Sequence, residues 1–516
     1  MKIIRTAILL TWLTALSACV INPVTGQREL ALVSAEDEVS IGTNQYAPSR
    51  QMQGGDYVLE PEVTRYVQDV GYRLAAVSDR DLPYEFAVLN SSVPNAWALP
   101  GGKIAINRGL LIELNSEAEL AAVLGHEIVH AAARHGAQAM QRGILLQGAV
   151  LAAGAAAQGS YSNLAVGAAG IGAQLINQRN GREAELESDF YGMQYMSRAG
   201  YDPQAAVSLQ QTFLRLSEGR SQGGWLAGLF ASHPPSAERV ARNMETAAML
   251  PPTGQLGREA YQAAIQPLRA AQPAYEAYDA ARTALREERT DEAERLAADA
   301  VRMLPAEAQF HALLGDIDYS RGRYQDTLAH YRDAVTRNDR FFYYNLRKGQ
   351  AHQRLSQWSD AEAEFAASIA LLPTADAYYG LGSLAERRGD RAAAMENYRL
   401  AAQSTSPAGQ AAQDAVVRLD LPTNPGQYLA VRSGLDANGQ LRIEVSNPTR
   451  LPVADVAFAV RYVDTANAIQ TRRFSLSELG ANEVRTLATG LGPFASTQSY
   501  EVSIEAARVV TEQSLR

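Results

Sequence analysis

The sequence has 516 residues, which is enough for three to four domains of ordinary size. Its 47% apolar content is that of a globular protein and excludes a chain that is disordered throughout. Lysine and arginine number 47 against 56 aspartates and glutamates, so the net charge of −9 leaves no basic excess for a nucleic acid partner. The single cysteine excludes an intramolecular disulfide and a thiolate metal cage.

Residues 1–18 have the pattern of an export signal, with two basic residues ahead of an apolar run that is too short to span a bilayer. Leu16–Cys19 resembles the lipobox of bacterial lipoproteins, in which the cysteine becomes the lipidated first residue. An ordinary secretory signal with an incidental cysteine is the alternative. Because Val20 rather than aspartate follows Cys19, the resemblance implies a lipid anchor in the outer membrane, with the later domains in the periplasm.

The next part of the chain begins with a polar N-terminal lead, residues 19–55, which precedes the first helical pattern. Apolar residues at helical spacing then predict a helix over 61–77. Alternation of apolar and polar residues predicts strands at 84–89 and 104–106. These elements indicate a domain that mixes helices with a small sheet.

A stronger helix is predicted from Ser116 to Arg134, with Ser116 as the N-cap and Glu119 as its capping-box partner. Residues 144–176 follow and are rich in alanine and glycine, but glutamine, serine and asparagine interrupt them. That composition suits a membrane-spanning helix poorly, so we expect a mobile or loosely packed lid or helical pair there.

An internal repeat of 34 residues extends over 275–418. Pro305, Asp339 and Pro373 lie 34 residues apart in succession, and glycine and aromatic positions recur with them. This period resembles the tetratricopeptide repeat, so we expect helix pairs stacked into a superhelix with a concave face. A non-repetitive helical bundle is the alternative. An atypical first unit and three clear units are expected at 275–305, 306–339, 340–373 and 374–407.

The C-terminal region, residues 422–516, changes to a period of two, as in Leu441, Ile443 and Val445. Turn residues separate its alternating segments, and six or seven short strands fit into the region. We therefore expect an all-β sandwich, in which no residue points to chemistry.

Candidate chemistry is concentrated in His126-Glu127-Ile128-Val129-His130, an HExxH motif on the predicted helix. Positions i and i+4 share one helix face about 6 Å apart, so the two imidazoles can reach one metal ion. Zinc suits nitrogen ligands and leaves a position open for water, and Glu127 lies beside that position as a general base.

A third ligand is expected from a second helix that begins near Glu185. Glu185 and Asp189 are four residues apart and share a face, so one of them could bind the metal while the other holds a ligand imidazole by its second nitrogen. Glu187 points away from both, which predicts a solvated side chain.

The HExxH motif together with Glu185-x-x-x-Asp189 resembles the M48 family of zinc metallopeptidases, in particular its periplasmic quality-control proteases. Three further stretches share the resemblance: the edge-strand segment Asn95–Ile104, the segment Ala133–His135 after the motif, and the His-Pro segment Ser232–Arg239. The resemblance extends over about residues 35–250, and the expected domain covers residues 56–265. The resemblance implies an α+β metallopeptidase domain, mainly helical, with the motif helix beside a small sheet.

The resemblance also implies roles for single residues. His126, His130 and Glu185 become ligands of one zinc ion, with Glu127 as the general base and Asp189 as the partner of a ligand histidine. The remaining residues leave alternatives open. His233 either takes the fourth metal position and keeps the enzyme latent or only orients substrate or caps a helix, and Arg239 either stabilises the oxyanion or forms a structural salt bridge. His135 is expected to be structural, because it lies about 140° further round the helix than His130.

Together these patterns predict a multidomain zinc endopeptidase. It would be lipid-anchored on the periplasmic face of the outer membrane and would hydrolyse unfolded or misassembled envelope proteins. An extended substrate would pair with the strand region Ala98–Ile106, and the repeats would dock clients or assembly machinery. The alternative is a latent protease that acts mainly as a repeat-based chaperone or scaffold.

Overall fold

The computed structural model describes residues 19–142, 181–218, 227–464, 466–495 and 500–510. The chain divides into two compact units, one built mainly from residues up to Gln357 and the other mainly from the residues after it. None of the helices in the described ranges has the length and apolar character that a bilayer crossing requires. The expected export signal and the segment 144–176 lie outside these ranges.

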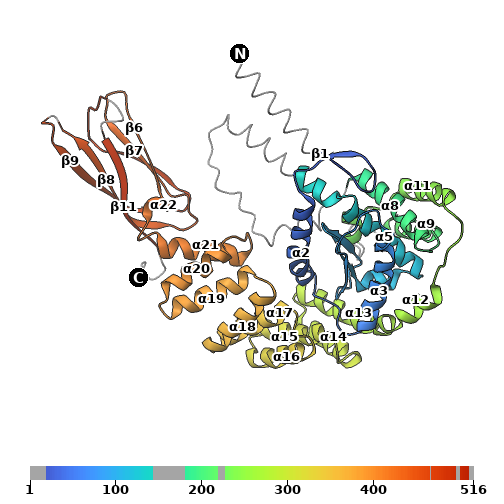
Figure 1. The fold of residues 1–516 in the computed structure, drawn as a ribbon. Helices are drawn as coiled ribbons and strands as arrows, with labels where there is room; N and C mark the ends of the chain where they lie inside the picture. Colours follow the sequence, from blue (N-terminus) through green and yellow to red (C-terminus); the bar gives the residue numbers. More distant parts are fainter. Residues whose placement is uncertain (1–18, 143–180, 219–226, 465, 496–499, 511–516) are drawn as a thin grey trace, which may run out of the picture. The chain divides into compact units, whose positions relative to one another are not determined.

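A three-stranded mixed sheet lies at the centre of the first unit (Figure 1). Across it the strands are β3 (Glu85–Leu89), β5 (Lys103–Asn107) and β4 (Ala96–Leu99). β3 runs parallel to β5 and β4 antiparallel to it, so β4 is an edge strand whose outer backbone groups face away from the sheet. The expected substrate-pairing region Ala98–Ile106 has to be narrowed accordingly. Of the two strands that it includes, β5 is paired on both sides and β4 is the edge strand.

Helices cover both faces of this sheet. α2 (Ala35–Met52) packs on one face, while α3 (Pro61–Ala75) and α5 (Glu117–Ala132) pack on the other. Successive residues of a strand point to opposite faces of the sheet. In β3, Phe86 and Val88 therefore pack in the core with α3 and α5, whereas Ala87 and Leu89 pack in the core with α2. The helices predicted over 61–77 and 116–134 are therefore present as α3 and α5.

Helix α2 lies within residues 19–55, where the sequence pattern shows no helix. Ser34 caps it in a capping box with Asp37. Its buried residues include Glu38 and Gln45, so the helix lacks the apolar stripe by which an amphipathic helix is recognised. In the sequence, the start of this helix is indicated by the capping residues Ser34 and Asp37 and not by apolar periodicity.

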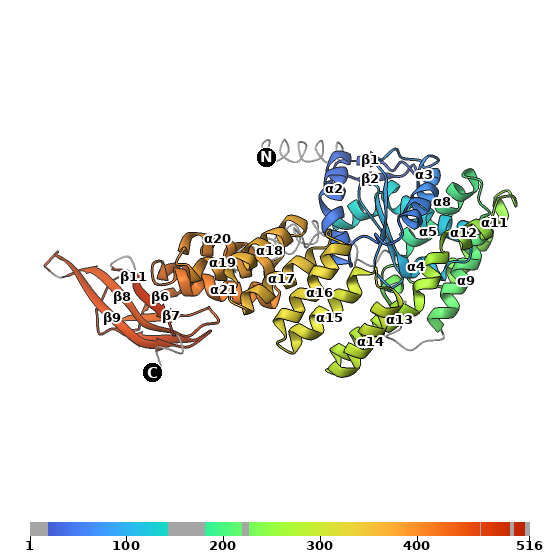
Figure 2. The same ribbon diagram turned by 90° about the horizontal axis from the view of Figure 1, so that it is seen from below.

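A short hairpin and further helices complete this part of the unit (Figures 1 and 2). Ser116 caps helix α5 as expected, because its hydroxyl accepts from the backbone N–H of Glu119. The expected capping box is formed only in part, since the Glu119 carboxylate accepts from the backbone N–H of Asn115 rather than from that of Ser116. The remaining elements are β1 (Cys19–Ile21), β2 (Arg28–Leu30), α4 (Arg108–Glu113), α8 (Arg182–Arg198), α9 (Gln204–Glu218), α10 (Ala227–Ser232), α11 (Ala237–Met249) and α12 (Arg258–Ala264).

The repeat region consists of helix pairs, which confirms the predicted helical repeat. The first helices of three pairs begin at Ala308, Phe342 and Ala375, so they are 34 and 33 residues apart. The helices are α13 (Gln266–Arg286), α14 (Thr290–Met303), α15 (Ala308–Ser320), α16 (Tyr324–Arg337) and α17 (Phe342–Arg354) in the first unit, then α18 (Trp358–Leu371), α19 (Ala375–Arg387), α20 (Arg391–Ala401), α21 (Pro407–Asp420) and α22 (Pro425–Tyr428).

Within a pair, a glycine of the first helix meets an aromatic ring of the second. A Cβ atom on Gly315 would lie 2.7 Å from the Tyr331 ring, and one on Gly382 would lie 2.6 Å from the Tyr398 ring. Real Cβ atoms do not approach so closely, so the ring occupies the space that the missing side chain leaves. This contact explains why the two residue types recur together in the sequence.

The C-terminal region forms two three-stranded antiparallel sheets in the order β10-β7-β6 and β11-β8-β9 (Figure 2). Apolar side chains from both sheets share one core, which confirms the predicted all-β sandwich. Its strands are β6 (Ala430–Leu435), β7 (Leu441–Ser446), β8 (Val453–Val463), β9 (Ile469–Leu479), β10 (Val484–Ala488) and β11 (Tyr500–Val509).

Candidate metal centre

The crossing of α5 and α8 determines where the candidate ligands lie. Both helices carry a glycine at the crossing, and a Cβ on Gly125 would lie 3.2 Å from the carbonyl oxygen of Gly192. A Cβ on Gly192 would in turn lie 3.1 Å from the backbone nitrogen of His126. The two backbones can therefore approach closely, and this brings the acidic face of α8 against the HExxH motif on α5.

Four candidate ligand residues, from the two helices α5 and α8 and from a short segment after α10, converge on one point. His126 Nε2 lies 3.0 Å from His130 Nε2 and 3.3 Å from His233 Nδ1. The carboxylate of Glu185 lies 3.3 Å from His130, 3.4 Å from His126 and 3.1 Å from His233. All four side chains are buried, and their ligand atoms lie within 4.8 Å of one another.

These separations fit a metal ion. Ligand atoms at about 2.1 Å from a tetrahedral Zn²⁺ ion lie roughly 3.4 Å apart from one another. The five separations given above, 3.0 to 3.4 Å, are close to that value. Three imidazole nitrogens and one carboxylate are also a donor set that Zn²⁺ accepts.

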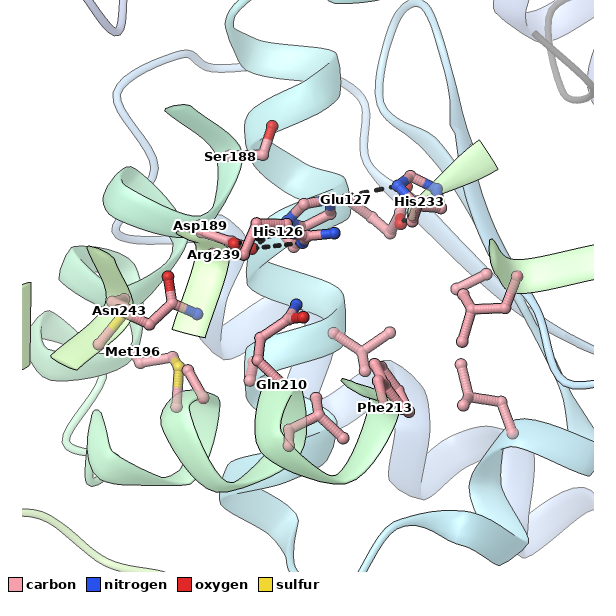
Figure 3. Close-up of a pocket in the computed structure, with 18 residues that line it drawn as sticks. His126, Glu127, Ser188, Asp189, Met196, Gln210, Phe213, His233, Arg239 and Asn243 are labelled. Atoms are coloured by element: carbon pink, nitrogen blue, oxygen red, sulfur yellow. Dashed lines mark hydrogen bonds and ion pairs between the residues drawn. The ribbon is translucent and has the colours of Figure 1, made fainter. Parts of the chain in front are cut away.

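Asp189 and Arg239 lie next to His126, as Figure 3 shows. Asp189 Oδ1 lies 2.9 Å from His126 Nδ1, the nitrogen that faces away from the ligand cluster. Arg239 donates from Nε and Nη2 to Asp189, both at 2.7 Å, and its Nη1 lies 2.9 Å from Glu185 Oε2. Of the two carboxylates that the sequence left open, the structure thus places Glu185 at the ligand position and Asp189 behind His126.

His135 lies against the candidate ligand His130, a position that its spacing in the sequence does not predict. His135 Nδ1 lies 2.8 Å from His130 Nδ1, and His135 Nε2 lies 3.2 Å from Glu187 Oε1. The expected separation round the helix does not apply, because α5 ends at Ala132 and Arg134 has a φ of 64°, which turns the chain back. Glu187, expected to be solvated, is only 27% exposed.

Burial and neighbouring charges shift the pKa values of the acidic groups. Burial raises the pKa of Glu127, so this carboxylate holds a proton more readily than an exposed one. Burial also disfavours ionised Asp189, but the charge and hydrogen bonds of Arg239 outweigh it and lower the pKa of Asp189 to about 2. Asp189 is therefore an ionised acceptor for the N–H of His126 at any physiological pH.

A pocket adjoins the cluster, and Figure 3 shows Gln210 and Phe213 on its wall. The space between its walls is about 540 Å³, counting the part that opens to solvent. Ala96 at the start of the edge strand β4 lines it together with His126 and Glu127. Most of its other walls are apolar side chains, namely Leu110, Ala122, Val123, Met193, Met196, Ala206, Leu209, Phe213 and Leu229.

Seven of the residues predicted to carry the chemistry therefore lie together: His126, Glu127, His130, Glu185, Asp189, His233 and Arg239. Cys19, the predicted lipidation site, lies apart from them in β1, where it pairs with Leu30. His233 Nε2 lies 3.5 Å from Glu127 Oε1, so this histidine contacts both the ligand cluster and the predicted base.

The chain is also similar to known peptidases over the region that contains this cluster. Residues 61–247 match the family described as "Peptidase family M48". The "Putative beta-barrel assembly-enhancing protease" of Vibrio cholerae serotype O1 is 30% identical over 202 residues, or 37% of this chain and 41% of that protein. The "Mitochondrial metalloendopeptidase OMA1" of Schizosaccharomyces pombe is 32% identical over 225 residues, or 43% of this chain and 64% of that protein. The chain thus spans less than two thirds of the length of these relatives.

Among solved structures, the chain is similar to proteins with tetratricopeptide repeats. The "Arabidopsis OM64 TPR domain" is 16% identical, with a TM-score of 0.23, and the match covers 23% of this chain and 98% of that one. "MamA 41-end from Desulfovibrio magneticus RS-1" is 18% identical, with a TM-score of 0.27, and the match covers 30% of this chain and 88% of that one.

Proposed function

Because residues 61–247 form a peptidase family M48 domain, we propose that the chain is a zinc-dependent endopeptidase of the periplasm. One zinc ion per chain would be held by His126, His130 and Glu185. The observation that carries the proposal is the near-tetrahedral spacing of the ligand atoms, with the carboxylate of Glu127 beside them. The sandwich domain has no assigned role in this function.

The chemistry follows from the residues around the cluster. Zinc, when bound, polarises the scissile carbonyl group and acidifies a water molecule. Glu127, whose carboxylate lies beside the cluster, would accept the proton of that water and later pass it to the leaving amine. Asp189 holds the Nδ1–H of His126, which leaves the Nε2 lone pair directed at the cluster.

Arg239 is better explained as a positioning residue than as an oxyanion donor. Nε and Nη2 are engaged by Asp189, and Nη1 lies against Glu185 and the backbone oxygen of Pro234. The guanidinium is buried as well, so its donors are directed at these protein oxygens. Of the two roles considered for Arg239, this geometry favours the structural salt bridge.

We infer that the substrate is an unfolded or misassembled envelope polypeptide. The edge strand β4 can add an extended segment through backbone hydrogen bonds, which only an unpaired stretch of chain can offer. The apolar pocket next to Ala96 can then receive a side chain of that segment. The name of the Vibrio cholerae relative, "Putative beta-barrel assembly-enhancing protease", supports clients of this kind. The helical repeats would dock these clients or the assembly machinery, and Cys19 would anchor the chain to the outer membrane.

The position of His233 favours a second candidate function, a latent protease that acts mainly as a chaperone or scaffold. Its Nδ1 occupies the fourth corner of the ligand group, where a catalytic site would keep water. A neutral imidazole there would displace that water. Replacing His233 by alanine should then raise peptide hydrolysis, measured as turnover of an unfolded client. Unaltered or lower turnover would contradict a blocking role for His233.

The main test compares the wild type with Glu127→Gln on an unfolded envelope β-barrel protein. We expect the variant to lose about 10²- to 10⁴-fold in cleavage rate while its bound zinc, measured by elemental analysis, stays the same. Removal of zinc by a chelator should abolish cleavage, and zinc should restore it. Unchanged cleavage by Glu127→Gln would contradict the peptidase. Rescue of client assembly without cleavage would support the scaffold role.

A further inference from the structure

We propose that His135 and Glu187 are positioning residues that fix the tautomer and the orientation of the ligand His130. The inference rests on the proposed function to the extent that it takes His130 Nε2 as a metal ligand. It goes further by assigning a role to two residues outside the ligand set. The chain of contacts runs from Glu187 on α8, through His135 after α5, to His130 within α5.

The contacts are short and shielded from water. His130 Nδ1 and His135 Nδ1 are 2.8 Å apart, and His135 Nε2 is 3.2 Å from Glu187 Oε1. The side chain of His135 is 5% exposed, so water does not compete for either of its nitrogens. The hydroxyl of Ser188 lies 3.4 Å from His135 Nδ1, where it can donate only to a nitrogen that carries no hydrogen.

The two facing nitrogens leave only one arrangement of hydrogens that suits a metal site. A ligand nitrogen needs a free lone pair, so His130 has to carry its hydrogen on Nδ1. That hydrogen is donated to His135 Nδ1, which must then be the acceptor. His135 consequently carries its hydrogen on Nε2, and Glu187 accepts it. The reverse assignment would place a hydrogen on His130 Nε2 and remove the lone pair from the cluster.

Helix α8 therefore supports both ligand histidines of α5. Asp189 contacts His126 directly, whereas Glu187 reaches His130 through His135. The turn at Arg134 makes the contact between His135 and His130 possible. The left-handed backbone of Arg134 reverses the chain, so that His135 lies back against the C-terminal end of α5. The side chain of Arg134 is held in this turn by Glu38, at 2.5 Å, and by the backbone oxygen of Val33, at 2.7 Å.

The test measures zinc affinity by competition with a chromogenic chelator, independently of hydrolysis. Glu187→Ala and His135→Leu should each weaken zinc binding about 10- to 100-fold. Glu187→Gln keeps a hydrogen-bond acceptor and should restore most of the affinity, which a purely structural role would not require. Glu183→Ala, an exposed carboxylate on the same helix, is the matched control and should bind zinc like the wild type. Wild-type affinity of Glu187→Ala would overturn the proposal.

Two further measurements keep the result interpretable if His135→Leu folds poorly. Glu187→Ala should have no additional effect in the His135→Leu background, whereas additive losses would overturn a shared path. Histidine ¹⁵N resonances of the metal-free protein should show His130 as the Nδ1–H tautomer in the wild type and a mixture in Glu187→Ala. A mixture already in the wild type would overturn the inference. Tight zinc binding with these effects but without any client cleavage would refute the proposed function and leave the inference standing.

Discussion

The metal-centre region and the helical repeat use charged side chains in opposite ways. Around α5 and α8, arginine and acidic groups are buried and converge on one cluster, as in Arg239 with Asp189 and Glu185. In the repeat, several pairs are exposed, such as Arg388 and Glu362 at 47% and 45%, although Arg347 and Asp316 form a partly buried pair. The packing of the helix pairs depends on rings that fill the space beside glycines. Buried charges are costly unless they are paired, so their concentration in one region indicates function, whereas exposed pairs indicate little.

The largest expected difference between the two regions comes from removing one paired arginine from each. Arg239→Met should lower the free energy of unfolding by about 3–5 kcal/mol, because it leaves two buried carboxylates without their partner. Arg388→Met should change it by at most about 1 kcal/mol, because the pair is exposed. Urea unfolding of the metal-free proteins measures both. Equal losses would show that burial does not separate the two regions.

A second prediction addresses the ring-to-glycine packing in the repeat. Gly315→Ala should destabilise the first unit by about 1–3 kcal/mol, because the new Cβ would lie 2.7 Å from the Tyr331 ring and overpack the helix pair. The better helix propensity of alanine offsets only part of this cost. Thermal unfolding measures the change. Combining it with Tyr331→Leu should cost less than the sum of the two single substitutions, and strict additivity would argue against the contact.

The smallest effect is expected from His311 in α15. Burial lowers the pKa of His311, so folding favours its neutral form. The unfolded chain takes up a proton as the pH falls through about 6.5, and stability should be lost in that window as the pH decreases. His311→Gln should flatten this dependence between pH 7.5 and 5.5, measured by hydrogen–deuterium exchange of α15 and α16. An identical slope in both proteins would contradict the assignment.

The sequence predicts those parts of the molecule that follow from spacing. His126 and His130 share a face because they are four residues apart, and the repeat is visible because Gly315 and Tyr331 recur with its period. Spacing alone could not choose between Glu185 and Asp189, since both lie on the same face of α8. The choice depends on where α8 crosses α5, which is a tertiary contact.

The features that the sequence does not predict also have local causes. Apolar periodicity does not predict helix α2, because its buried face contains polar residues such as Glu38, which pairs with Arg80 and Arg134. His135 was expected to point away because the helix was extended to Arg134, whereas α5 ends at Ala132. A single left-handed residue after a helix therefore changes which side chains meet, and a helical periodicity does not show it.

The glycines at the crossing of α5 and α8 have one more consequence. Since the distance between two rigid helices, and not a flexible loop, sets the spacing between His126 and Glu185, the coordination sphere is preorganised before any ion arrives. A methyl group on Gly125 would lie 3.2 Å from the carbonyl oxygen of Gly192, so the two helices would have to move apart by a few tenths of an ångström. The backbone approach at this point thus sets how far apart the candidate ligand atoms of the two helices lie, as well as how the helices pack.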